Sequence, residues 1–141
     1  EKYVPCDIEY SIGCDRLVLA LLCEAYDEEQ LENGETRIVM HFEPQIAPYK
    51  VCVLPLQKNL SEKAKEIYST LKKKFMCTYD EAGSIGKRYR RQDEIGTPYC
   101  VTIDFDTLEK GTVTVRDRDS MKQETIKVED LVSYISNKID N

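Results

Sequence analysis

The sequence predicts a three-layer α/β domain in which a mixed sheet of about five strands lies between helices. From residue 44 onward, apolar runs of strand length alternate with stretches of helical periodicity, in the order β-α-β-α-β-β-β-α. The first of these runs, residues 49–56, is typical of a strand that helices cover on both faces. We therefore expect one domain over residues 44–141 and a separate segment over residues 1–43.

The segment before residue 44 contains one clear helix. Residues 3–11 have the pattern of a strand, and the helix is expected to begin near Gly13. This helix is apolar almost all round, because residues 17–22 run without a polar break, so it needs cover on every side. Residues 27–36 are polar and contain the turn-forming pair Asn33-Gly34, so we expect a connector there.

The first helix of the domain is expected after the strand at residues 49–56. Its apolar stripe runs from Leu60 to Phe75, and either Asn59 or Ser61 is available as the N-cap. The other elements are expected at residues 76–81 (strand), 83–96 (helix), 98–105 (strand), 111–119 and 123–128 (two strands that pair), and 128–139 (helix).

The composition excludes several classes of protein. The chain has 20 basic and 26 acidic residues and a formal charge of −6, so binding of nucleic acid over the whole surface is not expected. The longest apolar run, residues 17–23, is too short to cross a membrane and lacks the flanks of a signal peptide. Six cysteines without a C-x-x-C pair, and a single histidine, favour reduced structural thiols and no metal site. Reduced thiols in turn predict a cytoplasmic protein.

One short stretch reverses the acidic character of the chain. Gly83 and Gly86 precede a run of four basic residues, namely Lys87, Arg88, Arg90 and Arg91. A Walker-type phosphate loop is excluded because Arg88, and not Ser or Thr, follows Lys87. The spacing of the two glycines matches the GXXG clamp of KH domains, although so short a motif is weak alone. These residues fit a solvated basic helix and a contact with a phosphate backbone about equally well.

A second charged stretch, residues 116–120, follows a strand of alternating character. Arg116 and Arg118 should share one face of this strand, with Asp117 and Asp119 on the other. An open face would present guanidinium and carboxylate groups, which can read the edges of bases. The alternative is a charged hairpin tip with ion pairs across the strands, and spacing alone favours it.

The sequence contains no evident set of residues that could form a complete active site. Asp93 and Glu94 are adjacent on a predicted helix, where neighbouring side chains diverge, so we expect two solvated charges. His41 has no evident catalytic partner in the sequence. A small α/β enzyme or nucleotide binder that uses the glycine turn remains an alternative function.

Taken together, the two charged stretches resemble a known family. "GSIGKRYRRQDEIGTP" and "TVTVRDRDSM", in their order here, are similar to the anticodon-binding domain of class II glycyl-tRNA synthetases of the homodimeric type. The related domains of threonyl-, prolyl- and histidyl-tRNA synthetases carry a looser version. The resemblance covers essentially the whole chain and implies a three-layer anticodon-binding domain over residues 44–141.

The N-terminal residues extend the resemblance. "IEYSIGCDR" is similar to motif 3 of the class II catalytic domain, which implies a strand-helix remnant of that domain within residues 1–43. By this resemblance Arg16 contacts ATP, and Glu9 and Ser11 hold glycine, although Tyr10 replaces the proline of many relatives. Motifs 1 and 2 are absent, so we expect a C-terminal fragment that is inactive alone. The parent enzyme is expected to be a homodimer that uses ATP and Mg²⁺.

The resemblance also implies the partner and its contacts. The expected partner is the anticodon arm of a glycine tRNA, and neither DNA nor a membrane is expected. The residues at the matching positions are Lys87, Arg88 and Arg91 for the backbone, and Arg116, Asp117 and Arg118 for the anticodon bases. A non-catalytic protein on the same fold, such as the accessory subunit of the mitochondrial DNA polymerase, is the alternative. The apolar helix near residues 13–26 is expected to fold back onto the domain or, preferably, to pair with a second copy.

Overall fold

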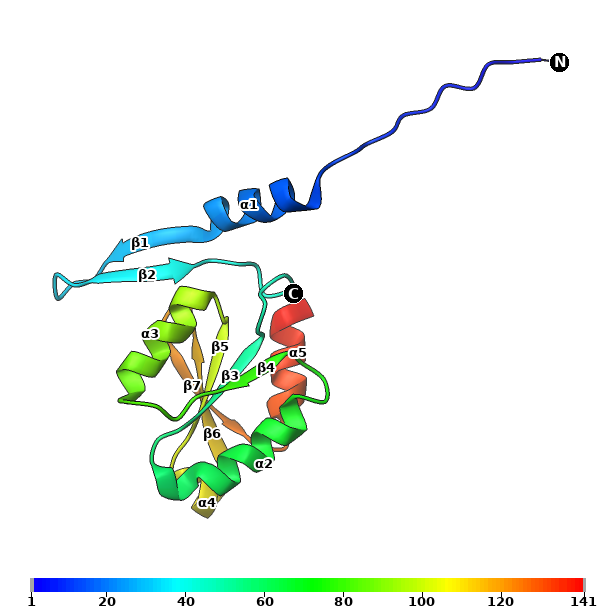
Figure 1. Cartoon of the computed structure of the whole chain (residues 1–141). Helices are drawn as coiled ribbons and strands as arrows, with labels where there is room; N and C mark the ends of the chain where they lie inside the picture. Colours follow the sequence, from blue (N-terminus) through cyan, green and yellow to red (C-terminus); the bar gives the residue numbers. More distant parts are fainter. Residues whose placement is uncertain (1, 141) are drawn as a thin grey trace.

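A mixed five-stranded sheet forms the centre of the molecule, in a computed structural model that describes residues 2–140 (Figure 1). The strand order is β4-β3-β5-β6-β7. β3 pairs in parallel with both β4 and β5, whereas β6 is antiparallel to β5 and to β7. The strands are β3 (Val51–Pro55), β4 (Cys77–Tyr79), β5 (Tyr99–Ile103), β6 (Thr112–Asp117) and β7 (Gln123–Lys127). The predicted mixed sheet of five strands from residue 44 onward is confirmed.

Helices cover both faces of this sheet. α2 (Ser61–Leu71) and α5 (Leu131–Asp140) lie on one face, and α3 (Ile85–Ile95) lies on the other (Figure 1). Successive residues of β3 point to opposite faces, so Val51 and Val53 pack in the core beneath α2 and α5, while Cys52 packs beneath α3. The uninterrupted burial of β3 and β5 explains why their sequences are apolar runs and lack alternation.

Two local features of the domain differ from the prediction. α2 has Leu60 as its N-cap, reached through the short turn η1 (Lys58–Leu60), so the capping role expected for Asn59 or Ser61 is wrong. A six-residue helix that the sequence pattern did not reveal, α4 (Phe105–Lys110), joins β5 to β6. The Asp104 carboxylate caps it by accepting the Thr107 N–H at 3.1 Å.

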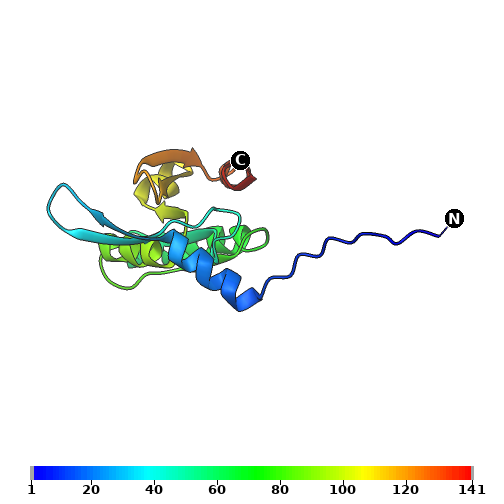
Figure 2. The same cartoon turned by 90° about the horizontal axis from the view of Figure 1, so that it is seen from above.

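Residues 2–25 contain one helix and no strand. α1 (Cys14–Ala25) confirms the predicted helix, but residues 2–13 have no regular secondary structure and run away from the domain (Figures 1 and 2). The strand expected at residues 3–11 is therefore wrong, because no neighbouring strand pairs with it within residues 2–140. In this described part of the chain, no helix is long and apolar enough to span a bilayer.

The expected polar connector is a β-hairpin. β1 (Tyr26–Gln30) pairs antiparallel with β2 (Thr36–Met40), and Gly34, with φ +80°, lies in the turn between them. β1 is polar because most of its residues are exposed, and this polarity hid the strand. In β2, by contrast, Arg37 and Val39 are buried. The hairpin lies beside α3, so this part of residues 1–43 packs directly on the domain (Figure 2).

Candidate nucleic-acid interface

The N-terminus of α3 is open to solvent. Ser84 stands at the N-cap position, and its side chain makes no capping hydrogen bond. Gly83, with φ +81°, and Gly86 would have no heavy atom within 4 Å of an added Cβ, so nothing covers the backbone there. Backbone N–H groups and the positive end of the helix dipole therefore face an exposed surface that suits an anion.

Lys87 places an exposed positive charge on this surface. Its side chain is exposed on the first turn of α3. Of the four basic residues on α3, Lys87 alone makes no hydrogen bond or ion pair with any residue in the range 2–140. It can therefore contact a phosphate group without first losing a partner.

Arg88 follows Lys87 in sequence, but its side chain points inward. It is 5% exposed, and its guanidinium donates to the Gly83 carbonyl at 3.0 Å and the Pro55 carbonyl at 2.6 Å. Pro55 is the last residue of β3, so Arg88 fixes the glycine turn to the end of that strand. This side chain shapes the surface but offers little charge to a ligand.

Arg90 and Arg91 lie on the solvent side of α3, and each has an acidic partner. Arg90 pairs with Glu35 in the hairpin turn. Arg91 donates from Nε to Asp80 Oδ2 at 3.0 Å and from Nη2 to the Ala82 carbonyl at 2.6 Å. Burial disfavours the charged form of Asp80, but the Ala82 N–H and the Arg91 guanidinium outweigh it, so the pKa of Asp80 lies below its ordinary value. Both arginines are therefore partly neutralised.

Arg116 belongs to a buried ionic network centred on Asp93. Its guanidinium donates to both Asp93 oxygens, at 2.8 Å and 3.1 Å, and lies 4.8 Å from the centre of the Tyr89 ring. Arg37 of the hairpin donates to the same carboxylate from Nε at 3.0 Å. Asp93 is 1% exposed, so the expectation of a solvated charge is wrong for Asp93, although Glu94 is exposed. One carboxylate thus joins α3, β6 and β2.

Arg118 is also enclosed. It is 2% exposed and donates to the carbonyls of Gly96 at 3.0 Å and Phe42 at 2.9 Å. It further donates to both carboxylate oxygens of Asp119. Arg116, in β6, and Arg118, in the turn after it, both face α3 and the hairpin, which close that side. Asp119, expected on the opposite face, pairs with Arg118 and His41, so that expectation is wrong. The closure could not be foreseen because the hairpin has the sequence of a connector.

Asp117 lies on the other side of the strand. Its Oδ1 accepts the Ser120 N–H and hydroxyl, both at 2.8 Å, which shapes the turn after β6. It is half-buried and lines a hollow of about 220 Å³ together with Tyr99, Ser120, Lys122, Glu124, Tyr134 and Lys138. Among the described residues, no donor is bound to Asp117 Oδ2. An acceptor atom is therefore available at this hollow.

The two charged stretches lie toward opposite ends of α3. Arg88 reaches Pro55, where β3 ends, whereas Asp93 binds Arg116, which is paired with Cys100 near the start of β5. Because β3 and β5 are parallel, these contacts mark opposite ends of the sheet. An extended ligand such as an RNA stem-loop could contact both ends, but a small molecule could not.

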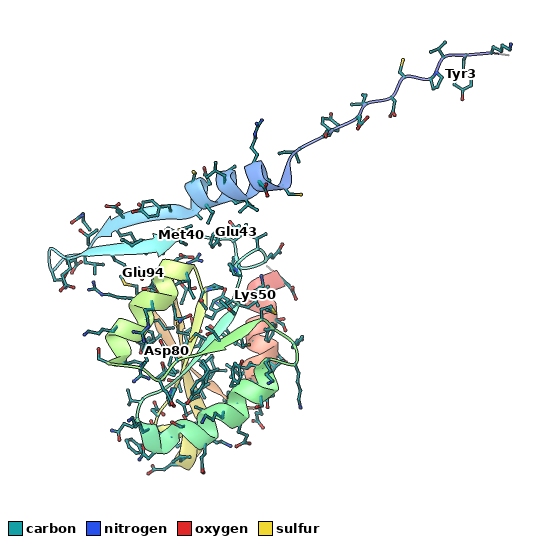
Figure 3. The ribbon with its side chains drawn as sticks, viewed as in Figure 1. Tyr3, Met40, Glu43, Lys50, Asp80 and Glu94 are labelled. Atoms are coloured by element: carbon teal, nitrogen blue, oxygen red, sulfur yellow. The ribbon has the colours of Figure 1, made fainter. Side chains whose placement is uncertain are left out.

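The residues expected to contact ATP and glycine are not assembled into a site. Glu9 and Ser11 are exposed on the extended segment that carries Tyr3 away from the domain (Figure 3), and Arg16 is exposed on the first turn of α1. Within residues 2–140 none of these three side chains makes a hydrogen bond or an ion pair. They do not form an ATP site on their own.

Comparison with known proteins identifies similar chains. The family model "Anticodon binding domain" matches residues 50–138. Glycine–tRNA ligase of Clostridium acetobutylicum is 65% identical over 139 residues, which is 99% of this chain and 30% of that protein. The enzymes of Clostridium kluyveri and Acetivibrio thermocellus are 62% and 60% identical over the same share. The chain thus spans about 30% of the length of these relatives.

A solved structure supports the fold. The RNA-binding domain of threonyl-tRNA synthetase from Cryptosporidium parvum superposes with a TM-score of 0.64 at 24% identity. The match covers 70% of this chain and 25% of that one. At this identity the likeness concerns the arrangement of sheet and helices.

Proposed function

Since this chain belongs to the anticodon-binding domain family, we propose that it is the tRNA-recognition part of a glycine–tRNA ligase. In this proposal it binds the anticodon arm of a glycine tRNA in the cytoplasm. The whole ligase would be a homodimer that uses ATP and Mg²⁺ to attach glycine to that tRNA. The observation that carries the proposal is the identity of 65% to a glycine–tRNA ligase along 99% of this chain.

The sugar–phosphate backbone is the first part of the proposed contact. The exposed N-terminus of α3 offers N–H groups and Lys87 offers an unpaired ammonium group. Arg91, which is 44% exposed, would join them by exchanging Asp80 for a phosphate. Arg88 would act indirectly, because its bonds to Gly83 and Pro55 hold the turn in shape.

The anticodon bases are the second part. Arg116 and Arg118 would position the end of β6, while Asp117 would provide an accessible acceptor beside the hollow. A carboxylate accepts a hydrogen bond from the N4 amino group of cytosine. All glycine codons begin with two guanines, so the pairing anticodon positions are both cytosine, and an acidic reader at this end of the sheet is chemically suitable.

A binding comparison tests this function. The 141-residue chain is titrated with the anticodon stem-loop of a glycine tRNA and with a stem-loop in which the two cytosines are replaced, at one fixed salt concentration. Loss of base contacts should weaken binding by about 1–3 kcal/mol per contact, which is roughly 5- to 150-fold. Equal affinity for the two stem-loops would contradict base recognition by this chain.

A further inference from the structure

A histidine and two carboxylates meet at the open end of the hairpin. His41 follows the last residue of β2, and its Nε2 lies 3.0 Å from Glu29 Oε1 and 3.7 Å from Asp27 Oδ2. Asp27 and Glu29 are two residues apart on β1, so both side chains point to the same face. One potential ligand atom from each of the three residues lies within 4.8 Å of the other two. This grouping combines one nitrogen donor with two oxygen donors.

The second ring nitrogen of His41 has a partner of its own. Nδ1 lies 2.6 Å from Asp119 Oδ1, and Arg118 holds Asp119 through both carboxylate oxygens. With Asp119 as the partner of Nδ1, Nε2 is the ring nitrogen that faces Asp27 and Glu29. A carboxylate behind the histidine is the usual support of a metal-bound imidazole.

The Glu29 carboxylate is held in a similar way. Arg37 donates to Glu29 Oε2 at 2.9 Å, which leaves Oε1 directed at His41. Asp27 is 58% exposed and His41 is 30% exposed, so an ion can enter from solvent. Arg37 and Arg118 are both buried, and they fix the orientation of two of the four acidic and imidazole groups before any ion arrives.

We propose that Asp27, Glu29 and His41 form a binding site for a divalent transition-metal ion of the Zn²⁺ type, with water completing the coordination. Around Zn²⁺ at about 2.0–2.1 Å, tetrahedral ligand atoms lie about 3.3 Å apart. The distances of 3.0 Å and 3.7 Å from Nε2 require shifts of less than 1 Å to reach that value. An imidazole ligand disfavours Mg²⁺ and Ca²⁺, which take oxygen ligands. A bound ion would tie the two ends of the hairpin together and, through Asp119, to the end of β6.

The sequence prediction of no metal differs from this proposal for a physical reason. Glu29 and His41 are 12 residues apart and meet only because β1 and β2 pair. A connector would not bring them together, and the sequence pattern indicated a connector.

The test uses the single histidine of the chain as a reporter. Cys6, Cys14 and Cys23 are exposed thiols that would compete for Zn²⁺, so they are first replaced by Ser. Zn²⁺ is titrated while the ¹⁵N resonances of the imidazole are recorded, and a chelator is then added. We expect a saturable shift of Nε2 that the chelator reverses, together with a higher melting temperature.

Variants decide which residues bind the ion. Asp27→Asn should weaken Zn²⁺ binding about tenfold or more, as loss of a ligand or its support does at metal sites. Glu28→Gln is the matched control. Glu28 lies between Asp27 and Glu29 on β1 and points to the opposite face, so this variant should bind Zn²⁺ as tightly as the parent chain. The Asp27 carboxylate is exposed and pairs with His41 alone among the described residues, so the variant should fold. An imidazole that does not respond to Zn²⁺, or an Asp27→Asn chain that binds Zn²⁺ as tightly as the control, would overturn the proposal.

Discussion

Individual basic residues of similar sequence context have very different surroundings in the fold. Lys87 is exposed and unpaired among the described residues, whereas its neighbour Arg88 is 5% exposed and bonded to two carbonyls. The sequence identifies both as members of one cluster but cannot assign their exposure. Exposure depends on the position of the end of β3, which is a long-range property. The exposure of each basic residue is therefore the property of the site that the sequence predicts least well.

Replacing Lys87 with Ala should weaken the binding of every RNA stem-loop about equally. The lost group is a phosphate contact, so the slope of log affinity against log salt should fall by about 1. Lys65→Ala, which removes an exposed charge from α2 on the other face of the sheet, is the control and should leave the slope unchanged. Titrations at several salt concentrations measure this. A Lys87→Ala chain that retains the parent slope would argue against a phosphate contact.

Replacing Asp93 with Asn should be strongly destabilising. Arg116 would keep its charge in a buried site without an ionised partner, and Arg37 would keep only Glu29, a loss that typically costs about 3–5 kcal/mol in the free energy of unfolding. The adjacent Glu94→Gln change, at an exposed position, should alter it by less than about 0.5 kcal/mol. Urea denaturation of both variants measures the difference. Similar midpoints for the two would mean that the network contributes little.

Among the elements, those of the domain could be predicted and those that join them could not. β3, β5, α2 and α5 have regular apolar patterns, because one or both of their faces are buried against a neighbour. β1 and α4 have no such pattern, since β1 is mostly exposed and α4 has six residues. β1 and β2 close the face that contains Arg116 and Arg118. Because the sequence does not reveal β1 as a strand, it also does not reveal that Arg116 and Arg118 are buried.

Gly96 tests the attachment of the hairpin to the domain. This residue ends α3 with φ +80°, and an added Cβ would lie 2.5 Å from Phe42 Cδ2 and 2.9 Å from the Met40 carbonyl oxygen. Gly96→Ala should therefore lower the free energy of unfolding by about 2–5 kcal/mol, from backbone strain and overpacking together. Amide exchange in β2 should rise at the same time.

The matched control is Gly111→Ala. Gly111 has φ +67° but no heavy atom within 4 Å of an added Cβ, so it isolates the backbone term. It should cost about 1–2 kcal/mol and leave amide exchange in β2 unchanged. Equal effects of the two variants would show that the contact with Phe42 and Met40 relaxes without cost.

At the scale of the whole molecule, α1 is the part without cover. Leu17, Val18, Leu19, Leu21 and Leu22 are between 38% and 60% exposed. Only Ala25 of this helix is buried, so the expected fold-back onto the domain is not seen. Self-pairing, the other expectation, stays a prediction.

We predict that the 141-residue chain associates through α1. Burying a large aliphatic side chain stabilises by about 1.5–3 kcal/mol, which favours any partner that covers these residues. Sedimentation velocity should show dimers or larger species for the chain, and monomers for a variant with Leu17→Gln and Leu21→Gln. A truncation at residue 44 is unsuitable as a control, because it would also remove Arg37 and its bond to Asp93. Monomers in both samples at the same concentration would contradict the prediction.

The ion pairs of Arg90 with Glu35 and Arg91 with Asp80 have a consequence for selectivity. Each carboxylate already occupies the place that a phosphate would take, so an incoming polyanion must compete with groups of the protein itself. A disordered or poorly shaped nucleic acid gains too little from each exchange to displace them. An RNA that fits α3 along its length would exchange both ion pairs at once, and only the sum of the two would be favourable. Acidic residues beside a basic helix can thus make binding selective for nucleic acids whose shape allows several phosphate contacts at the same time.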